Sequence, residues 1–209
     1  MKKILLLAVL LVSAISMNAA DQLKINSFEA PADCSNDDYE YFFEITLDNE
    51  VADKYTALEF RLFLPEGLEV KDGADGFEFT KDRFGKIVRG NWICDHAINV
   101  FAKQKDGGYL VSLADAKLSK IHGTSGTVLN VYYTTTKDYK GGEIAIKTQK
   151  LLVSSTEVIR PEDFVMTTTG VKEANADEAS VKAQKFMTKK GLVIAKGNKK
   201  YNAAAQEVK

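Results

Sequence analysis

The chain contains few of the residues that usually carry catalysis. Its 209 residues include two histidines, His96 and His122, which lie 26 positions apart and outside any nucleophile-elbow or triad signature, although Ser112, Ser119 and Ser125 supply hydroxyl groups nearby. The 29 acidic residues are scattered mostly in turns and single out no pair of carboxylates for glycoside hydrolysis. We therefore predict a protein that is not an enzyme and that has no catalytic residues, no cofactor and no metal.

The chain also lacks an excess of positive charge. It has 28 basic and 29 acidic residues, and removal of Lys2 and Lys3 with a signal peptide leaves 26 against 29, so about three net negative charges. This balance disfavours nucleic acid and anionic membrane surfaces as partners.

Cysteine is scarce, with only Cys34 and Cys94 present. In an oxidising compartment the two can form a disulfide between an early loop and the middle of the domain. The alternative is two separate small buried thiols. No cysteine lies at the signal boundary, so lipid anchoring through a thioether is not supported.

One uninterrupted apolar run is present, at the start of the chain. Residues 4–12 are apolar, Lys2 and Lys3 precede them, and small residues follow, a pattern typical of an export signal over residues 1–20 with cleavage after Ala19 or Ala20. A membrane span needs roughly 18 apolar residues, and this run is shorter. We expect a secreted mature protein of about 190 residues without a membrane span.

A sustained helical period is missing between residues 21 and 164, where short strand-like runs alternate with turn signals. Residues 55–70 show the pattern best. Leu58, Phe60, Leu62 and Leu64 alternate with Ala57, Glu59, Arg61 and Phe63, and the strand ends on a turn formed by Pro65, Glu66 and Gly67. We predict an all-β, antiparallel β-sandwich over residues 21–165.

Composition changes after residue 165. Residues 166–180 are polar, rich in alanine and short of aromatics, which predicts a linker. Residues 181–209 contain two or three short strand-like runs, which cannot bury a core alone. They form a small C-terminal β element, a β-hairpin appendage that is marginal unless it docks on something.

A candidate ligand site surrounds the only tryptophan. Trp92 is flanked by Arg89, Asn91, Asp95 and His96, a combination of one flat ring with several hydrogen-bonding groups. This pattern predicts a carbohydrate-binding platform. The alternative is a tryptophan that packs under a loop.

Several motifs resemble one known family. They are YTALEFRLFLPEGLEV (residues 55–70), GGYLVSLADAKLSKIHGTSGTVLNVYY (residues 107–133) and KGGEIAIKTQKLLVSS (residues 140–155). Their order resembles that of cohesin-like domains of the carbohydrate-binding jelly-roll superfamily, found in secreted bacterial polysaccharide-degrading systems, over roughly residues 23–164. The resemblance implies a jelly-roll sandwich that docks a dockerin-like protein through one sheet face, for which we nominate Glu59, Arg61 and Phe63.

The tail carries a weaker resemblance. KKGLVIAKGNKKYNAAAQEVK (residues 189–209) is similar to the endings of proteins exported by the type-nine secretion route, although it is shorter than a complete signal of that kind. This resemblance implies a cell-surface location. We expect a secreted or cell-surface protein, and a periplasmic one if the tail is not a sorting signal.

Three hypotheses follow from the sequence. The leading one is a secreted, non-catalytic module that docks a protein partner in an extracellular polysaccharide-handling assembly. The second is a carbohydrate-binding module that uses Trp92 and binds polysaccharide. The third is a purely structural surface subunit.

Overall fold

The computed structural model describes residues 21–208 except for 27, 32–33, 35–39, 102, 172–183 and 197–198. The predicted export signal lies outside the described residues. No helix among the described residues has the length and apolar character needed to cross a membrane.

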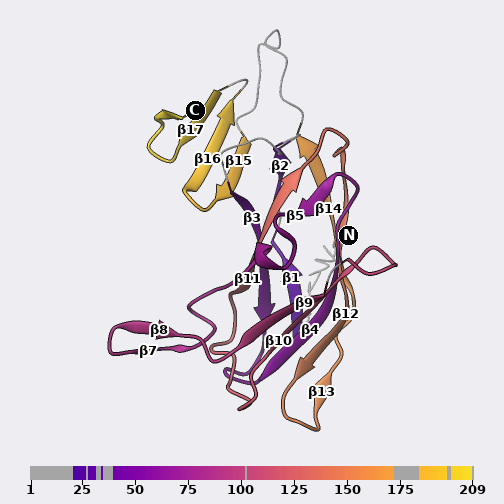
Figure 1. Cartoon of the computed structure of the whole chain (residues 1–209), viewed down its shortest axis with the longest axis vertical. Coiled ribbons are helices and arrows are strands. Elements are labelled where there is room, and N and C mark those ends of the chain that lie inside the picture. Colours follow the sequence, from indigo (N-terminus) through magenta and orange to yellow (C-terminus); the bar gives the residue numbers. More distant parts are fainter. Residues whose placement is uncertain are drawn as a thin grey trace, which may run out of the picture.

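Two antiparallel sheets dominate the described part of the chain (Figure 1). The first sheet has the order β18-β17-β16-β15-β3-β11-β5, with β1 paired to β3 and β6 paired to β11. Its strands are β1 (Gln22–Ile25), β3 (Tyr41–Asp48), β5 (Leu68–Val70), β6 (Phe77–Phe79), β11 (Thr127–Thr135), β15 (Gln184–Thr188), β16 (Gly191–Lys196), β17 (Lys199–Asn202) and β18 (Glu207–Val208).

The second sheet has the order β2-β14-β12-β4-β10-β9, with β13 paired to β12. Its strands are β2 (Ala30–Pro31), β4 (Ala57–Phe63), β9 (Ala97–Phe101), β10 (Tyr109–Ala114), β12 (Gly141–Leu152), β13 (Val158–Ile159) and β14 (Phe164–Val171). The pairing of β2 with β14 is parallel. A separate two-stranded ribbon, β7 (Lys86–Val88) and β8 (Asn91–Ile93), projects from the sandwich.

The core lies between the two sheets and follows the predicted alternation. On β4, Leu58, Phe60 and Leu62 are fully buried, and Leu64 beyond its end packs against the same core. On β3, four alternate side chains fill the facing layer: Tyr41, Phe43, Ile45 and Leu47. Burial of these large side chains is the main stabilising contribution to the sandwich. The predicted all-β sandwich is confirmed.

The turn after β4 also forms as predicted. Leu68 N donates to Pro65 O at 3.2 Å, and Gly67 has φ 79°. A Cβ atom on Gly67 would lie 2.4 Å from the backbone nitrogen of Tyr139, so only glycine fits both the dihedral angle and the close approach.

Strand β14 extends beyond the expected end of the sandwich. It pairs with β12 from Ile146↔Phe164 to Gly141↔Thr169, so residues 166–171 belong to the second sheet. The expected linker at 166–180 is therefore strand in its first six residues, and residues 172–180 lie outside the described part. Consecutive threonines at 167–169 have good β-propensity, which outweighs the polar composition once β12 offers a partner edge.

The C-terminal strands extend the first sheet. We call β15 to β18 the C-terminal meander. Its attachment to the sandwich is short: Thr188 pairs with Tyr41, and Lys189 N donates to Glu40 O at 2.9 Å. Phe186 is buried and packs edge-on against the Tyr41 ring with centroids 6.0 Å apart. The meander therefore buries its apolar face by docking on the edge of β3.

The two cysteines have separate environments, and the structure does not join them. Buried Cys34 Sγ accepts hydrogen bonds from Thr135 N and Thr135 Oγ1, both at 3.2 Å. Cys94 Sγ donates to His96 O at 3.4 Å. Of the two alternatives drawn from the sequence, the structure corresponds to separate sulfur environments, because Cys34 packs beside β11 while Cys94 follows the β7–β8 ribbon.

Candidate docking face and the pockets around it

The outer face of the second sheet is built around the residues of β4 that point away from the core. Glu59, Arg61 and Phe63 are all half-buried on this face. Their cross-strand partners share the face because directly paired residues point the same way. Arg61 lies between Leu110 of β10 and Lys147 of β12, and Phe63 lies beside Ala145, which is paired in turn with Val165.

Charges on this face are largely compensated within the plane of the sheet. Lys150 pairs with Glu59, and Arg61 pairs with Asp106 in the turn before β10. Lys147 Nζ lies 5.2 Å from the centroid of the Phe63 ring, in a cation–π contact. The face therefore combines neutralised ion pairs with accessible apolar surface.

Val165 contributes the most exposed apolar side chain of this face, with half of its surface accessible (50%). Phe63 on β4 and Leu110 on β10 are partly exposed on the same face, two and three strands away from β14. Mixed polar and apolar surface of this kind is the composition of a protein–protein interface.

A hollow of about 520 Å³ opens on the same face, and we call it the bulge pocket. Strands β4, β10 and β12 supply one part of its lining, and the segment between β13 and β14 supplies the rest. The lining residues are Glu59, Arg61, Leu110, Thr148, Gln149 and Lys150 from the strands and Arg160 and Pro161 from that segment.

A β-bulge in β12 shapes this pocket. Lys147 pairs with Arg61 and Lys150 pairs with Glu59, so Thr148 and Gln149 together oppose the single residue Phe60. The extra residue sends both Lys147 and Lys150 to the outer face although they are three positions apart. Thr148 has φ 50°, a strained conformation for a β-branched residue.

Hydrogen bonds hold the bulge from both sides. Gln149 is buried, accepts from Leu23 N at 2.8 Å, and donates to Glu162 O at 3.0 Å. Thr148 N donates to Asp163 Oδ1 at 2.9 Å. These contacts tie β12 to β1 and to the segment that carries Arg160 and Pro161, so the pocket walls are fixed relative to each other.

Sequence reasoning nominated Glu59, Arg61 and Phe63 but missed the other half of the pocket. The sequence alone indicates two separate strand-like runs in this region, residues 143–148 and 151–153, because the polar run from Lys147 to Lys150 interrupts the alternation. The structure has one continuous strand there, with the interruption forming the bulge. The sequence does contain a sign of the bulge. The alternation of apolar and polar residues shifts there, yet no glycine or proline is present to end the strand.

The second nominated site lies on the β7–β8 ribbon, away from this face. Trp92 is half-buried, packs against the core, and donates from Nε1 to Phe84 O at 2.7 Å. Lys81 Nζ lies 6.0 Å from its ring centroid. This is the geometry of the alternative drawn from the sequence, in which the tryptophan anchors a loop.

The residues flanking Trp92 are not gathered into one site. Arg89 and Asn91 are exposed at the turn of the ribbon, where Arg89 and Gly90 both have positive φ, as a two-residue hairpin loop requires. Asp95 is half-buried. His96 is buried, its Nε2 lies 3.2 Å from Thr56 O, and burial lowers its pKa despite that contact.

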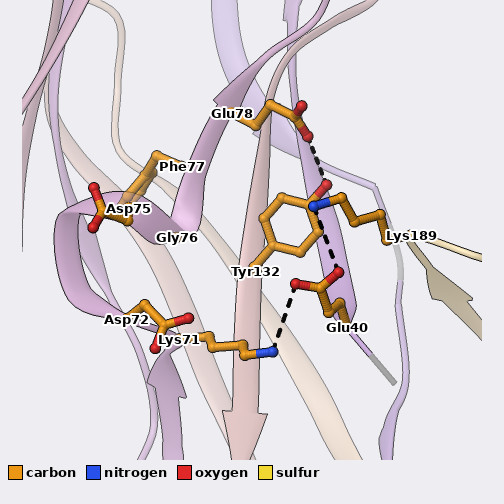
Figure 2. Close-up of a pocket in the computed structure, with 9 residues that line it drawn as sticks. All are labelled: Glu40, Lys71, Asp72, Asp75, Gly76, Phe77, Glu78, Tyr132 and Lys189. Atoms are coloured by element: carbon orange, nitrogen blue, oxygen red, sulfur yellow. Dashed lines mark hydrogen bonds and ion pairs between the residues drawn. The ribbon is translucent and has the colours of Figure 1, made fainter. Parts of the chain in front are cut away.

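A second, smaller pocket of about 230 Å³ lies where the C-terminal meander meets the sandwich (Figure 2). Lys71 and Lys189 approach the carboxylate of Glu40 from two sides, at 3.7 and 3.5 Å, and Tyr132 donates to Glu78 at 2.6 Å. Burial and the Glu78 carboxylate together raise the pKa of Tyr132. Lys189 of the meander contacts both the Glu40 carboxylate and the Tyr132 ring of the sandwich, so it serves the docking of the meander, while Lys71 holds Glu40 from within the sandwich.

The turn at residues 72–76, which has a superficial likeness to a calcium loop, forms a short 3-10 helix (η1, Gly73–Gly76) preceded by Asp72 in the left-handed conformation. Within the described part of the chain, no group of three or more His, Cys, Asp or Glu side chains converges as a metal site would require.

Comparisons with known proteins give a likeness of fold. No protein-family model matches the sequence, and no curated protein matches it. The solved structures similar to it include a non-cellulosomal cohesin from the archaeon Archaeoglobus fulgidus, at 15% identity over 73% of this chain and 93% of that one, with a TM-score of 0.46.

A cohesin module of a family 33 glycoside hydrolase from Clostridium perfringens is similar at 12% identity over 74% of this chain and 98% of that one, with a TM-score of 0.45. The third ScaB cohesin of R. flavefaciens, solved in complex with a group 1 dockerin, is similar at 12% identity over 73% and 97% of the two chains, also with a TM-score of 0.45. Each of these likenesses is distant and concerns the fold alone.

Proposed function

We propose that the protein is a non-catalytic docking module that binds a protein partner through the outer face of β9, β10, β4, β12 and β14. The observation that carries this proposal is the composition of that face. The ion pairs Lys150–Glu59 and Arg61–Asp106 neutralise the charges of β4, while Phe63, Leu110 and Val165 leave apolar surface accessible. Such a surface loses little binding free energy when it is desolvated, and it gains binding free energy from apolar contact with a partner.

The setting of this activity is part of the proposal. The export signal at residues 1–20 supports a secreted or cell-surface location, and the cohesin-like motifs support an extracellular polysaccharide-handling assembly with a dockerin-like partner. The C-terminal meander docks on β3, so a sorting role for residues 181–209 requires that the meander be recognised while docked or after release.

No observation favours the carbohydrate alternative at Trp92. The indole Nε1 is occupied by the carbonyl of Phe84, and the ring is half-buried against the core. A sugar platform needs an accessible ring face, so this hypothesis stays a prediction from the sequence.

The test is capture of secreted proteins by the immobilised mature chain, alongside a glycan array. A captured protein is identified, purified and titrated against the wild type and two valine variants. Val165→Asp introduces a charge on the proposed face, and Val51→Asp introduces the same charge at another exposed valine, in the segment between β3 and β4 and on no strand of that face.

We expect Val165→Asp to weaken binding by tenfold or more, about 1.4 kcal/mol, because it buries a charge in the interface. Val51→Asp should bind as the wild type does. Equal binding by both variants would overturn the proposed face. A glycan signal that disappears in Trp92→Ala would replace the proposal with the carbohydrate hypothesis.

A further inference from the structure

The bulge pocket carries an uncompensated positive charge. Among its lining residues, Arg61, Lys150 and Arg160 are cations and Glu59 is the one anion. Lys150 is paired with Glu59 and Arg61 with Asp106. Arg160 is exposed and has no ion-pair partner among the residues that the structure describes. One guanidinium group therefore stands at the rim with its charge unmatched.

The backbone around Arg160 is restrained. Arg160 directly follows β13, in which Ile159 pairs with Leu151, and it directly precedes Pro161, which disfavours helical conformations of the residue before it. Glu162 O and Asp163 Oδ1 are bonded to the bulge. A donor on a fixed backbone loses less conformational entropy on binding than one on a mobile loop.

The rest of the lining determines which anion fits. Leu110 and Pro161 contribute apolar surface, and the planar guanidinium offers paired N–H donors that match the two oxygens of a carboxylate. A carboxylate carried on an aliphatic stem can contact both. The volume of about 520 Å³ accommodates one or two side chains and is too small for a folded element.

We propose that the bulge pocket is the specificity site of the docking face and that it takes an acidic side chain, Asp or Glu, from the protein partner. Arg160 binds the carboxylate, and Leu110 and Pro161 contact the apolar part of the same segment. This inference rests on the proposed function, because it names the partner chemistry that the docking face recognises.

The first test uses short synthetic peptides and the full mature chain. The peptides come in matched pairs that differ only in Asp against Asn or Glu against Gln beside a leucine, and polygalacturonate serves as an acidic polysaccharide. We expect the acidic member of a pair to bind about tenfold more tightly than its amide, and the difference to shrink at high salt. Equal binding of acid and amide would overturn the inference, and binding of polygalacturonate alone would assign the pocket to acidic glycans instead.

The second test uses the arginine itself. Arg160→Gln removes the charge, Arg160→Glu reverses it, and Arg160→Lys keeps it while losing the paired donors, so affinity for the acidic peptide should fall in the order wild type, Lys, Gln, Glu. Arg89→Gln is the matched control, since Arg89 is also an exposed arginine but lies at the turn of the β7–β8 ribbon. An unchanged affinity in Arg160→Glu would contradict the proposal.

Failure of this inference can be distinguished from failure of the proposed function. If the captured protein loses affinity in Val165→Asp but binds Arg160→Glu as it binds the wild type, the docking face is right and the acidic-side-chain pocket is wrong. If acidic peptides lose affinity in Arg160→Glu while the captured protein binds both variants as it binds the wild type, the pocket binds acidic side chains but the proposed docking face is wrong.

Discussion

The sandwich and the C-terminal meander are both made of antiparallel strands, yet they are held in different ways. Strand β4 is paired along its length on both sides, by β10 and β12, and its inner side chains are fully buried. The meander is joined to the sandwich through one residue pair, one backbone hydrogen bond, the contact of Phe186 with Tyr41, and the polar contacts of Lys189 with Glu40 and of Lys200 with the Tyr41 hydroxyl. The contrast teaches that a strand in a shared sheet gains stability mainly from the core beneath it, so the meander should open separately from the sandwich.

The largest effect is expected in the core of the sandwich. Phe60→Ala should lower the free energy of unfolding by about 3–5 kcal/mol, because it leaves a cavity beneath β4. Urea unfolding followed by tryptophan fluorescence measures it. Its neighbour Arg61→Ala removes an exposed ion pair and should cost less than about 1 kcal/mol. Similar losses in the two variants would contradict the assignment of inner and outer faces.

A smaller effect is expected where the described chain begins. Asp21 is buried and accepts hydrogen bonds from Glu50 N at 2.7 Å, Lys54 Nζ at 2.6 Å and the Tyr55 hydroxyl. Burial alone would raise its pKa, but these donors outweigh burial and hold the pKa below its ordinary value. Asp21→Asn should therefore destabilise the sandwich at neutral pH, by about 1–3 kcal/mol.

The pH dependence of that effect follows from the lowered pKa. The stabilisation by Asp21 is present above the pKa of the unfolded state and is lost as the pH falls through the lower pKa of the folded state. The melting temperatures of wild type and Asp21→Asn should therefore converge as the pH falls below about 4. A difference that persists unchanged into strong acid would show that the carboxylate charge does not contribute.

The meander should respond locally. Phe186→Ala removes its main apolar contact with Tyr41, so amide protons of β15 and β16 should lose their protection against hydrogen exchange. The free energy of unfolding of the sandwich, measured in urea, should change by less than about 1 kcal/mol. Met187→Ala is the control, since Met187 is exposed on the same strand. A large global loss in Phe186→Ala would show that meander and sandwich unfold as one unit.

The smallest effect is expected at the pocket between the two regions. Lys189→Ala removes an exposed ion pair with Glu40, a contact of about 0–1 kcal/mol. Hydrogen exchange of β15 should increase slightly, and raising the salt concentration should produce the same slight increase in the wild type. A strong loss of protection would mean that this ion pair, and not Phe186, holds the meander.

Regular alternation made part of the structure readable from the sequence. The faces of β3 and β4 and the turn at Gly67 form as predicted, because a half-buried strand has to alternate and a close backbone approach requires glycine. β14 was missed because polar threonines resemble a linker, although their branched Cβ atoms favour strands. The bulge was missed because an extra residue in a strand looks like the end of one.

The residues of the candidate site also fall into two groups, those that the sequence predicted and those that it did not. The position of Glu59, Arg61 and Phe63 on the outer face could be predicted, because they alternate with core residues on one strand. Arg160 gave no signal, because nothing in its local sequence shows that Gln149 and Asp163 bring it beside β4. The environment of Trp92 was likewise decided by a distant contact, the hydrogen bond to Phe84 O.

The sequence by itself therefore determined the class of fold and the strands of the core, since these depend on local periodicity and composition. Only the tertiary structure decided that β12 is one bulged strand, that residues 166–171 complete the second sheet and that the C-terminal strands dock on β3. The physical reason is that these features depend on partners distant in the chain, and hydrogen bonds and burial between such partners leave no period in the local sequence.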